Sequence, residues 1–147
     1  MKQEDKELLL RDLCARLPYG VKAYVKNWSK LDREYYEGVY TVESIHPSLN
    51  TILVYSERFS VEVIVGYDDY EIKPYLFPLS SMTEEQKEEL NNIFDLDVEI
   101  AITHIKNGIP NLFTGLNRLN WFIKNHFDIY GLIPMGLAND ATDKNIY

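Results

Sequence analysis

The 147-residue chain has very little cysteine, which limits the covalent ways of holding it together. Its single cysteine, Cys14, cannot form a disulfide within the chain, and such usage is typical of a reducing compartment. No apolar run approaches the roughly 20 residues of a membrane-spanning helix. The charged first residues also lack the apolar core of a signal peptide. We therefore expect a cytoplasmic protein that makes no contact with a membrane.

Patterns that mark catalytic or cofactor sites are also scarce. The three histidines are His46, His104 and His126, and none stands at a metal-ligand spacing from another histidine or from the cysteine. The glycines form no phosphate-binding loop. These patterns predict no metal, no cofactor and no catalytic residue. An enzyme whose site assembles from residues distant in sequence stays as the third interpretation.

Basic residues are rare in the middle of the chain. Residues 35–100 hold 3 Lys and Arg against 14 Asp and Glu, so the net charge of −8 is concentrated there. Neutralising phosphates requires clustered Lys and Arg, and we therefore expect no direct binding of nucleic acid. The acidic middle has two interpretations. It is either a solvated face that aids solubility or a surface for a basic partner.

What the sequence does contain is a change of hydrophobic period. Residues 2–17 have helical spacing, with Leu9 and Leu13 in one apolar stripe. Cys14 stands beside that stripe, so we expect it to be a small buried side chain rather than a nucleophile. From Val21 the period becomes two, which predicts β-strands. The predicted strands are residues 21–28, 39–45, 51–55, 61–65 and 72–76.

Short strands joined by tight turns are typical of small barrels. We predict an SH3-like five-stranded β-barrel over residues 20–76. Alternation along the second strand places Val39 and Ile45 on the same face. The pattern ends at Pro74 and Pro78, which can donate no ladder hydrogen bond and so indicate an edge strand.

Thr83 provides the strongest helix start in the sequence. Its hydroxyl can accept a backbone N–H of the first turn, with Gln86 at the third position of a capping box. Glu84 and Glu85 lie in that first turn, where the helix dipole favours negative charge.

The last third of the chain contains one more strong amphipathic helix, predicted at residues 112–126. The segment 97–105 fits a strand or a helix, and its β-branched content favours a strand. Residues 128–147 are predicted to be loop. The whole chain is therefore expected to be one α+β domain, with a helical appendix over residues 83–147.

Trp121 lies nearly opposite the apolar stripe of this predicted helix. One interpretation is that the tail folds back over the indole, because its apolar side chains need a packing partner. The other is an exposed anchor for a partner, since tryptophan is enriched at binding hot spots. The acidic side chains of the capped helix are a second candidate binding surface. They are Glu84, Glu85, Glu88 and Glu89.

Several motifs resemble one group of proteins. The run from Lys73 to Glu85, the stretch from Leu17 to Val21 and segments between Trp121 and Ala138 carry the resemblance. They resemble short uncharacterised proteins of gut anaerobic bacteria, their phages and mobile elements. That group often has Tyr-Arg before a glycine where this chain has Ile129-Tyr130. The resemblance implies a genomic setting and transfers no functional residue.

These observations predict a non-enzymatic binding or accessory protein whose partner is a protein. The alternative is an acidic decoy or inhibitor that binds a basic host nucleic-acid-binding or defence protein.

Overall fold

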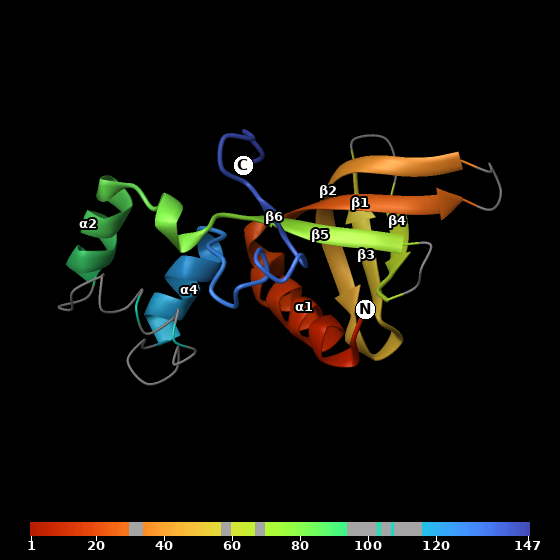
Figure 1. Ribbon diagram of the computed structural model, residues 1–147, viewed down its shortest axis with the longest axis horizontal. Coiled ribbons are helices and arrows are strands. Elements are labelled where there is room, and N and C mark those ends of the chain that lie inside the picture. The colour runs from red at the N-terminus through yellow and green to blue at the C-terminus, as the bar shows by residue number, and fades with distance from the viewer. Residues whose placement is uncertain (30–33, 57–59, 67–69, 94–102, 104–106, 108–115) are drawn as a thin grey trace.

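The computed structural model describes residues 1–29, 34–56, 60–66, 70–93, 103, 107 and 116–147. Among the described residues, a sheet with one helix beneath it forms one end of the molecule, and two further helices form the other end (Figure 1). The helices are α1 (Gln3–Arg16), α2 (Glu84–Ile93) and α4 (Leu116–Lys124). The short 3-10 turns are η1 (Leu17–Tyr19), η2 (Pro47–Leu49) and η3 (Leu79–Ser81). In the part of the chain that is described, no helix combines the length and apolar character needed to cross a bilayer.

In the described part of the chain, the sheet is open and has six strands in the order β4-β3-β2-β1-β5-β6. Its strands are β1 (Lys22–Ser29), β2 (Glu34–His46), β3 (Thr51–Tyr55), β4 (Ser60–Ile64), β5 (Tyr70–Leu76) and β6 (Asn139–Asp140). The first five pair antiparallel, and β6 runs parallel to β5.

The α+β class and the N-terminal helix are confirmed, but the SH3-like barrel predicted over residues 20–76 is not. All five predicted strands form. They do not close into a barrel, because β5 pairs with β1 on one side and receives β6 on the other. The prediction that residues 128–147 contain only loop is also wrong, because β6 lies within that tail.

Helix α1 covers the inner face of the sheet. Leu9 and Leu13 are fully buried there, as the helical stripe predicted. The burial predicted for Cys14 is wrong, because its side chain is exposed. One residue along a helix corresponds to about 100° of rotation, so Cys14 points away from the direction of Leu13. The buried face of α1 is therefore narrower than the stripe of apolar residue types predicts.

Strand β2 changes face within its length. The pairing with β3 shifts between Val42 and Ser44, where an extra residue is inserted. Such a bulge reverses the alternation of side chains. Val39 is therefore on the outer face, whereas Ile45 packs against the core of the sheet. The prediction that both residues share a face is wrong.

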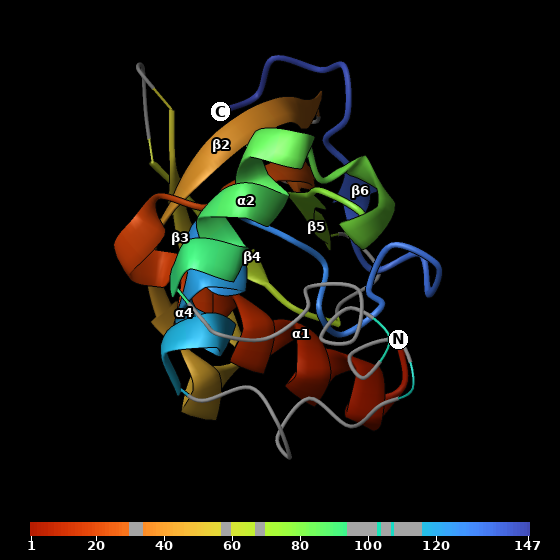
Figure 2. The same cartoon turned by 90° about the vertical axis from the view of Figure 1, so that its left-hand side faces the viewer.

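The helical end of the molecule has a core of its own, centred on Phe122 and Phe127. Figure 2 looks onto this end, with α2 in front and α4 behind it. Helix α4 ends at Lys124, two residues before the predicted end, and residues 112–115 of the predicted range lie outside the described part of the chain. The uncertain segment 97–105 also lies outside it, apart from Thr103.

The capping box at the start of α2 is confirmed. The backbone N–H of Gln86 donates to the Thr83 hydroxyl at 3.2 Å, and the Thr83 N–H donates to the Gln86 side chain at 2.9 Å. Two donors that the helix itself cannot satisfy are thus satisfied reciprocally.

The reciprocal bonds predict a specific pattern of mutational effects. Thr83→Ala should lower the free energy of unfolding by about 1 kcal/mol, whereas Thr83→Asn and Thr83→Asp should be close to neutral because both can cap. Urea titrations of the three variants measure this. Equal losses in all three would show that the hydroxyl contributes no cap.

Candidate functional site

A fully buried ion pair lies where α1 meets the helical end of the molecule. Arg16 and Asp12, one helical turn apart, are both 0% exposed. The guanidinium Nε and Nη2 each donate to one Asp12 carboxylate oxygen at 2.8 Å. Nη1 and Nη2 also donate to the carbonyls of Ile123, at 3.3 Å, and Phe127, at 2.8 Å. Burial raises the pKa of the Asp12 carboxyl, and Arg16 acts against that shift.

Of the two carbonyls, that of Ile123 lies in the last turn of α4 and that of Phe127 lies just beyond it, where the helix closes with a Schellman motif. The N–H of Phe127 donates to the Phe122 carbonyl at 2.9 Å, and the N–H of His126 donates to the Ile123 carbonyl at 3.1 Å. The rings of Phe122 and Phe127 meet edge to face, the apolar contact that usually accompanies this motif. Arg16 thus places its positive charge at the negative end of α4.

His126 occupies the left-handed position of that motif, with φ of 59°. Glycine is usual there, because a side chain costs energy in this conformation. The imidazole stacks on the Tyr147 ring with centroids 3.9 Å apart and planes 11° from parallel. Burial and the nearby Arg16 charge lower the pKa of His126 to about 4. The imidazole is therefore neutral at neutral pH and packs against Tyr147 as an uncharged ring.

Tyr147 holds the tail against the sheet. Its hydroxyl donates to the Tyr75 carbonyl at 2.7 Å and accepts from the Lys22 N–H at 3.2 Å. The β1–β5 pairing ends at Ala23 opposite Pro74, so Lys22 and Tyr75 would be the next pair. The hydroxyl stands in for the direct hydrogen bond that is missing there. Burial raises its pKa to about 12, so it remains a donor at neutral pH.

This polar cluster is closed to a ligand at its centre, because Asp12 and Arg16 are fully buried. Its role is structural: it fixes the path of the tail over the outer face of the sheet, the face opposite α1. Two grooves lie on that face beside the tail.

The larger of these grooves, which we call the outer-face groove, has a volume of about 520 Å³. Its centre is apolar, formed by Val39 of β2, Tyr55 of β3 and Ile146 of the tail. Val39 is 44% exposed and Tyr55 is 48% exposed. The two strands bring them together, because Thr41, two residues after Val39, pairs with Tyr55. The remaining lining residues are polar and are Lys22, Thr41, Ser56 and Asn145.

The second groove is polar and has a volume of about 360 Å³. Glu71 and Lys73 of β5 form an ion pair of 2.7 Å there, and Tyr24 of β1 pairs with Lys73 across the strands. Burial and a hydrogen bond with Glu37 raise the pKa of Tyr24 to about 12. These charges are already matched within the protein.

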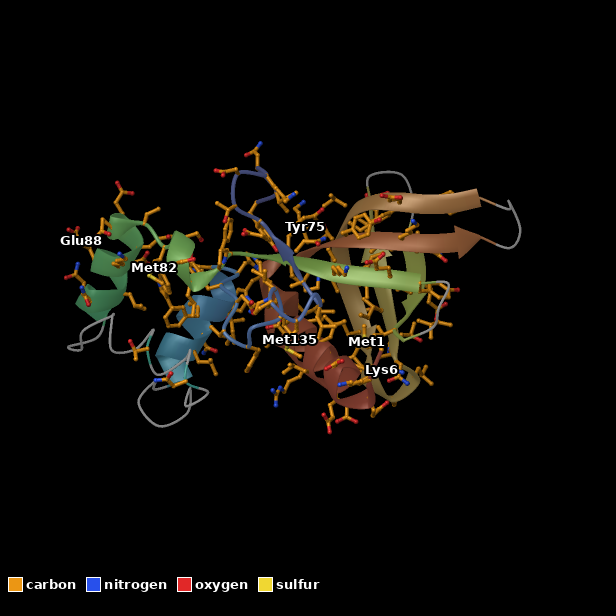
Figure 3. All side chains as sticks on the ribbon, viewed as in Figure 1. Met1, Lys6, Tyr75, Met82, Glu88 and Met135 are labelled. Atoms are coloured by element: carbon orange, nitrogen blue, oxygen red, sulfur yellow. The ribbon has the colours of Figure 1, made fainter. Side chains whose placement is uncertain are left out.

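The four predicted glutamates all lie exposed on α2, at the end of the molecule farthest from the sheet (Figure 1). Glu88 points away from the body of the molecule, while Met82 lies between α2 and α4 (Figure 3). Leu90 and Met82 attach this end through the core. Glu84 forms an ion pair of 2.7 Å with Lys87. The structure therefore groups these residues on one surface, and no described contact occupies the other three.

Trp121 is only 7% exposed, so an exposed anchor is not what the structure contains. Its ring stacks on Phe127 with centroids 5.8 Å apart and meets Phe122 edge to face. The residues that cover the Trp121 indole differ from the predicted ones. Leu79, Met82 and the start of the tail share its cluster, whereas residues farther along pack on Leu76 instead.

Sequence patterns missed the groups that shape this site. A charged pair one turn apart, such as Asp12 and Arg16, usually marks a solvated helix face. Val39 and Tyr55 are ordinary strand residues, and only the register brings them together. For metals, no group of three or more His, Cys, Asp or Glu side chains in the described ranges could hold an ion.

The buried pair predicts strongly coupled mutations. Arg16→Met should lower the free energy of unfolding by about 3–5 kcal/mol, because the Asp12 carboxylate would stay buried without a partner. Asp12→Leu/Arg16→Met should cost less than Arg16→Met alone, since no buried charge remains. Arg11→Met, on an exposed position of the same helix, is the control and should cost at most about 1 kcal/mol, because it removes a contact between the guanidinium and the Tyr130 ring, 4.9 Å to the ring centroid, but leaves the buried pair in place. Additive losses in a double-mutant cycle would contradict the coupling.

The neutral His126 predicts a pH dependence of stability. Between about pH 6.5 and about pH 4, the His126 imidazole is protonated in the unfolded chain but stays neutral in the folded protein. The free energy of unfolding should therefore fall as pH falls through this window, by up to about 3 kcal/mol. His126→Asn tolerates the left-handed backbone and removes the titration. Chemical denaturation from pH 7 to 4 should show a smaller decline in this variant, and identical declines would contradict the prediction.

Comparison of the chain with protein-family models, with curated proteins and with solved structures found no match. The resemblance of its motifs to phage and mobile-element proteins therefore stays a prediction. A function for this chain has to be inferred from the geometry of its surfaces.

Proposed function

We propose that this chain is a non-enzymatic binding protein and that a protein partner docks in the outer-face groove. The observation that carries the proposal is the exposure of Val39 and Tyr55 side by side on one face of the sheet. An apolar centre with a polar rim is the usual anatomy of a protein interface. Tyrosine is also among the residues most enriched at binding hot spots.

The rigidity of the groove supports the same function. Its walls are paired strands of the sheet, and its third side is a tail held by the Tyr147 hydroxyl. A preformed surface loses little conformational freedom when it binds, which leaves more of the contact energy for affinity.

A second candidate function is the acidic decoy, in which α2 binds a basic host protein. The observation that favours it is that all four glutamates of α2 are exposed at one end of the molecule (Figure 1). Such a surface would act mainly by electrostatic attraction, so its binding would weaken steeply with added salt.

One capture experiment separates the two candidates. The full chain is immobilised as bait in a native lysate, and the proteins retained by each variant are quantified by mass spectrometry. Val39→Thr/Tyr55→Thr should reduce the specific partner at least tenfold, because it removes the apolar centre while keeping residues that favour strands. Leu49→Ser is the matched control, since Leu49 is 68% exposed but lies outside the groove.

The outcomes assign the surface. A partner lost with the groove variant and kept with Leu49→Ser supports the proposal. A partner kept by the groove variant, but lost when Glu84, Glu85, Glu88 and Glu89 are changed to Lys, transfers the function to α2. A partner retained equally by all variants would refute both candidates.

A further inference from the structure

One edge of β5 is only partly covered. Strand β6 pairs with Tyr75 and Leu76, at the end of β5. The preceding residues of β5, from Tyr70 to Pro74, pair with β1 on the opposite edge. Within the described ranges, no strand pairs with these residues on the β6 side.

The direction of the backbone groups on this edge is fixed by two contacts. The Leu76 carbonyl accepts from the Ala141 N–H at 2.8 Å, so the groups of Leu76 point toward β6. The Tyr75 carbonyl points the other way, toward β1 and the Tyr147 hydroxyl. Because successive residues of a strand alternate between its edges, Tyr70 and Ile72 present both N–H and C=O to the open edge. Pro74 presents a carbonyl there and, lacking an N–H, loses no donor.

A groove of about 340 Å³ lies along this edge, and we call it the β5-edge groove. Its apolar lining includes Val65 from beyond the end of β4, Ile72 of β5 and Leu137 of the tail. Met1 also lines it and is shown below β5 in Figure 3, close to Lys6. The charged side chains among its lining residues are Glu71 and Lys73, which pair with each other.

The tail leaves this groove open because its own backbone is used elsewhere. A backward extension of β6 would place Ala138 and Leu137 opposite Pro74 and Lys73. Instead, the N–H groups of Leu137 and Ala138 both donate to the Leu132 carbonyl, at 2.9 and 3.2 Å. The pairing with β5 therefore starts only at Asn139, and no strand of the described chain pairs with the donors and acceptors of β5 before that point.

We propose that the β5-edge groove binds an extended segment of a partner protein, which adds a strand to β5 directly before β6. A row of alternating backbone donors and acceptors is recognised by another strand, whose main chain supplies the complementary row. Strand β6 is an example of this recognition, because it already pairs with the same edge of β5. This binding surface is distinct from the outer-face groove, with which it shares no lining residue.

The lining predicts the partner's side chains. In an extended segment, alternate side chains point to opposite faces. One set would meet the apolar lining and should therefore be apolar at every second position. Lys6 supplies charge at one end, because its Nζ lies 3.4 Å from where a side-chain Cβ of Gly66 would be. Lys6 has no ion pair with any described residue, so an acidic residue of the partner fits beside it.

The test uses a phage-displayed library of random heptapeptides, selected on the immobilised full chain. Selected sequences should carry apolar residues at alternate positions and an acidic residue near one end. Two synthetic versions of the best peptide then carry N-methyl groups on alternate backbone amides, one version for each edge of the peptide. One version should lose affinity about tenfold and the other should bind within twofold of the parent, because only one edge faces β5.

Hydrogen exchange locates the peptide on the protein. The amides of Tyr70 and Ile72 should gain protection when the peptide binds. Lys6→Gln should weaken binding about threefold to fivefold, whereas the matched change Lys124→Gln, on α4, should leave it unchanged. Failure to select any peptide, equal effects of the two N-methylated versions, or protection at Ser60 and Glu62 of β4 instead would overturn the proposal.

Discussion

The Arg16 guanidinium connects the two ends of the chain, and the placement of α4 and of the tail depends on that connection. From the last residue of α1, the guanidinium donates to carbonyls that lie more than 100 residues away in sequence, near the end of α4. Helix ends need partners for their last carbonyls, and a buried carboxylate needs a partner for its charge. One side chain satisfies both needs. The buried network therefore fixes where the last helix ends and from where the tail departs.

The path of the tail in turn shapes the two grooves that we propose as binding surfaces. After Asp128, whose carboxylate accepts the backbone N–H groups of Leu132 and Ile133 at 2.8 and 2.9 Å, the chain turns back toward the sheet. It then supplies β6, one wall of the outer-face groove and part of the lining of the β5-edge groove. Loosening of the tail would therefore alter both grooves together, while the core between α1 and the sheet would remain.

Local patterns in the sequence predicted the elements whose causes are local. Period-two alternation located five strands, and the Thr83 capping box located the start of α2, because both signals arise between near neighbours. The open sheet was not predictable in this way, since β6 has only two residues and follows a turn-rich tail. The burial of Asp12 and Arg16 was equally unpredictable, because it depends on hydrogen bonds to carbonyls that are distant in the sequence. The bulge in β2 places Val39 and Ile45 on opposite faces of the sheet, and no residue type in that strand predicts the bulge.

An open sheet exposes backbone groups that can pair with other chains, so its edges need protection against aggregation. Strand β4 is short and carries the exposed Glu62 at its centre, which disfavours pairing with a second sheet. Strand β5 is protected differently: β6 covers its end, and Pro74 removes a donor from the uncovered part. What remains open is the short stretch from Tyr70 to Ile72. Such a short stretch disfavours sheet-to-sheet association, and its alternating groups are those with which the proposed peptide would pair. The cover by β6 and the missing donor at Pro74 thus restrict this edge to a short added strand.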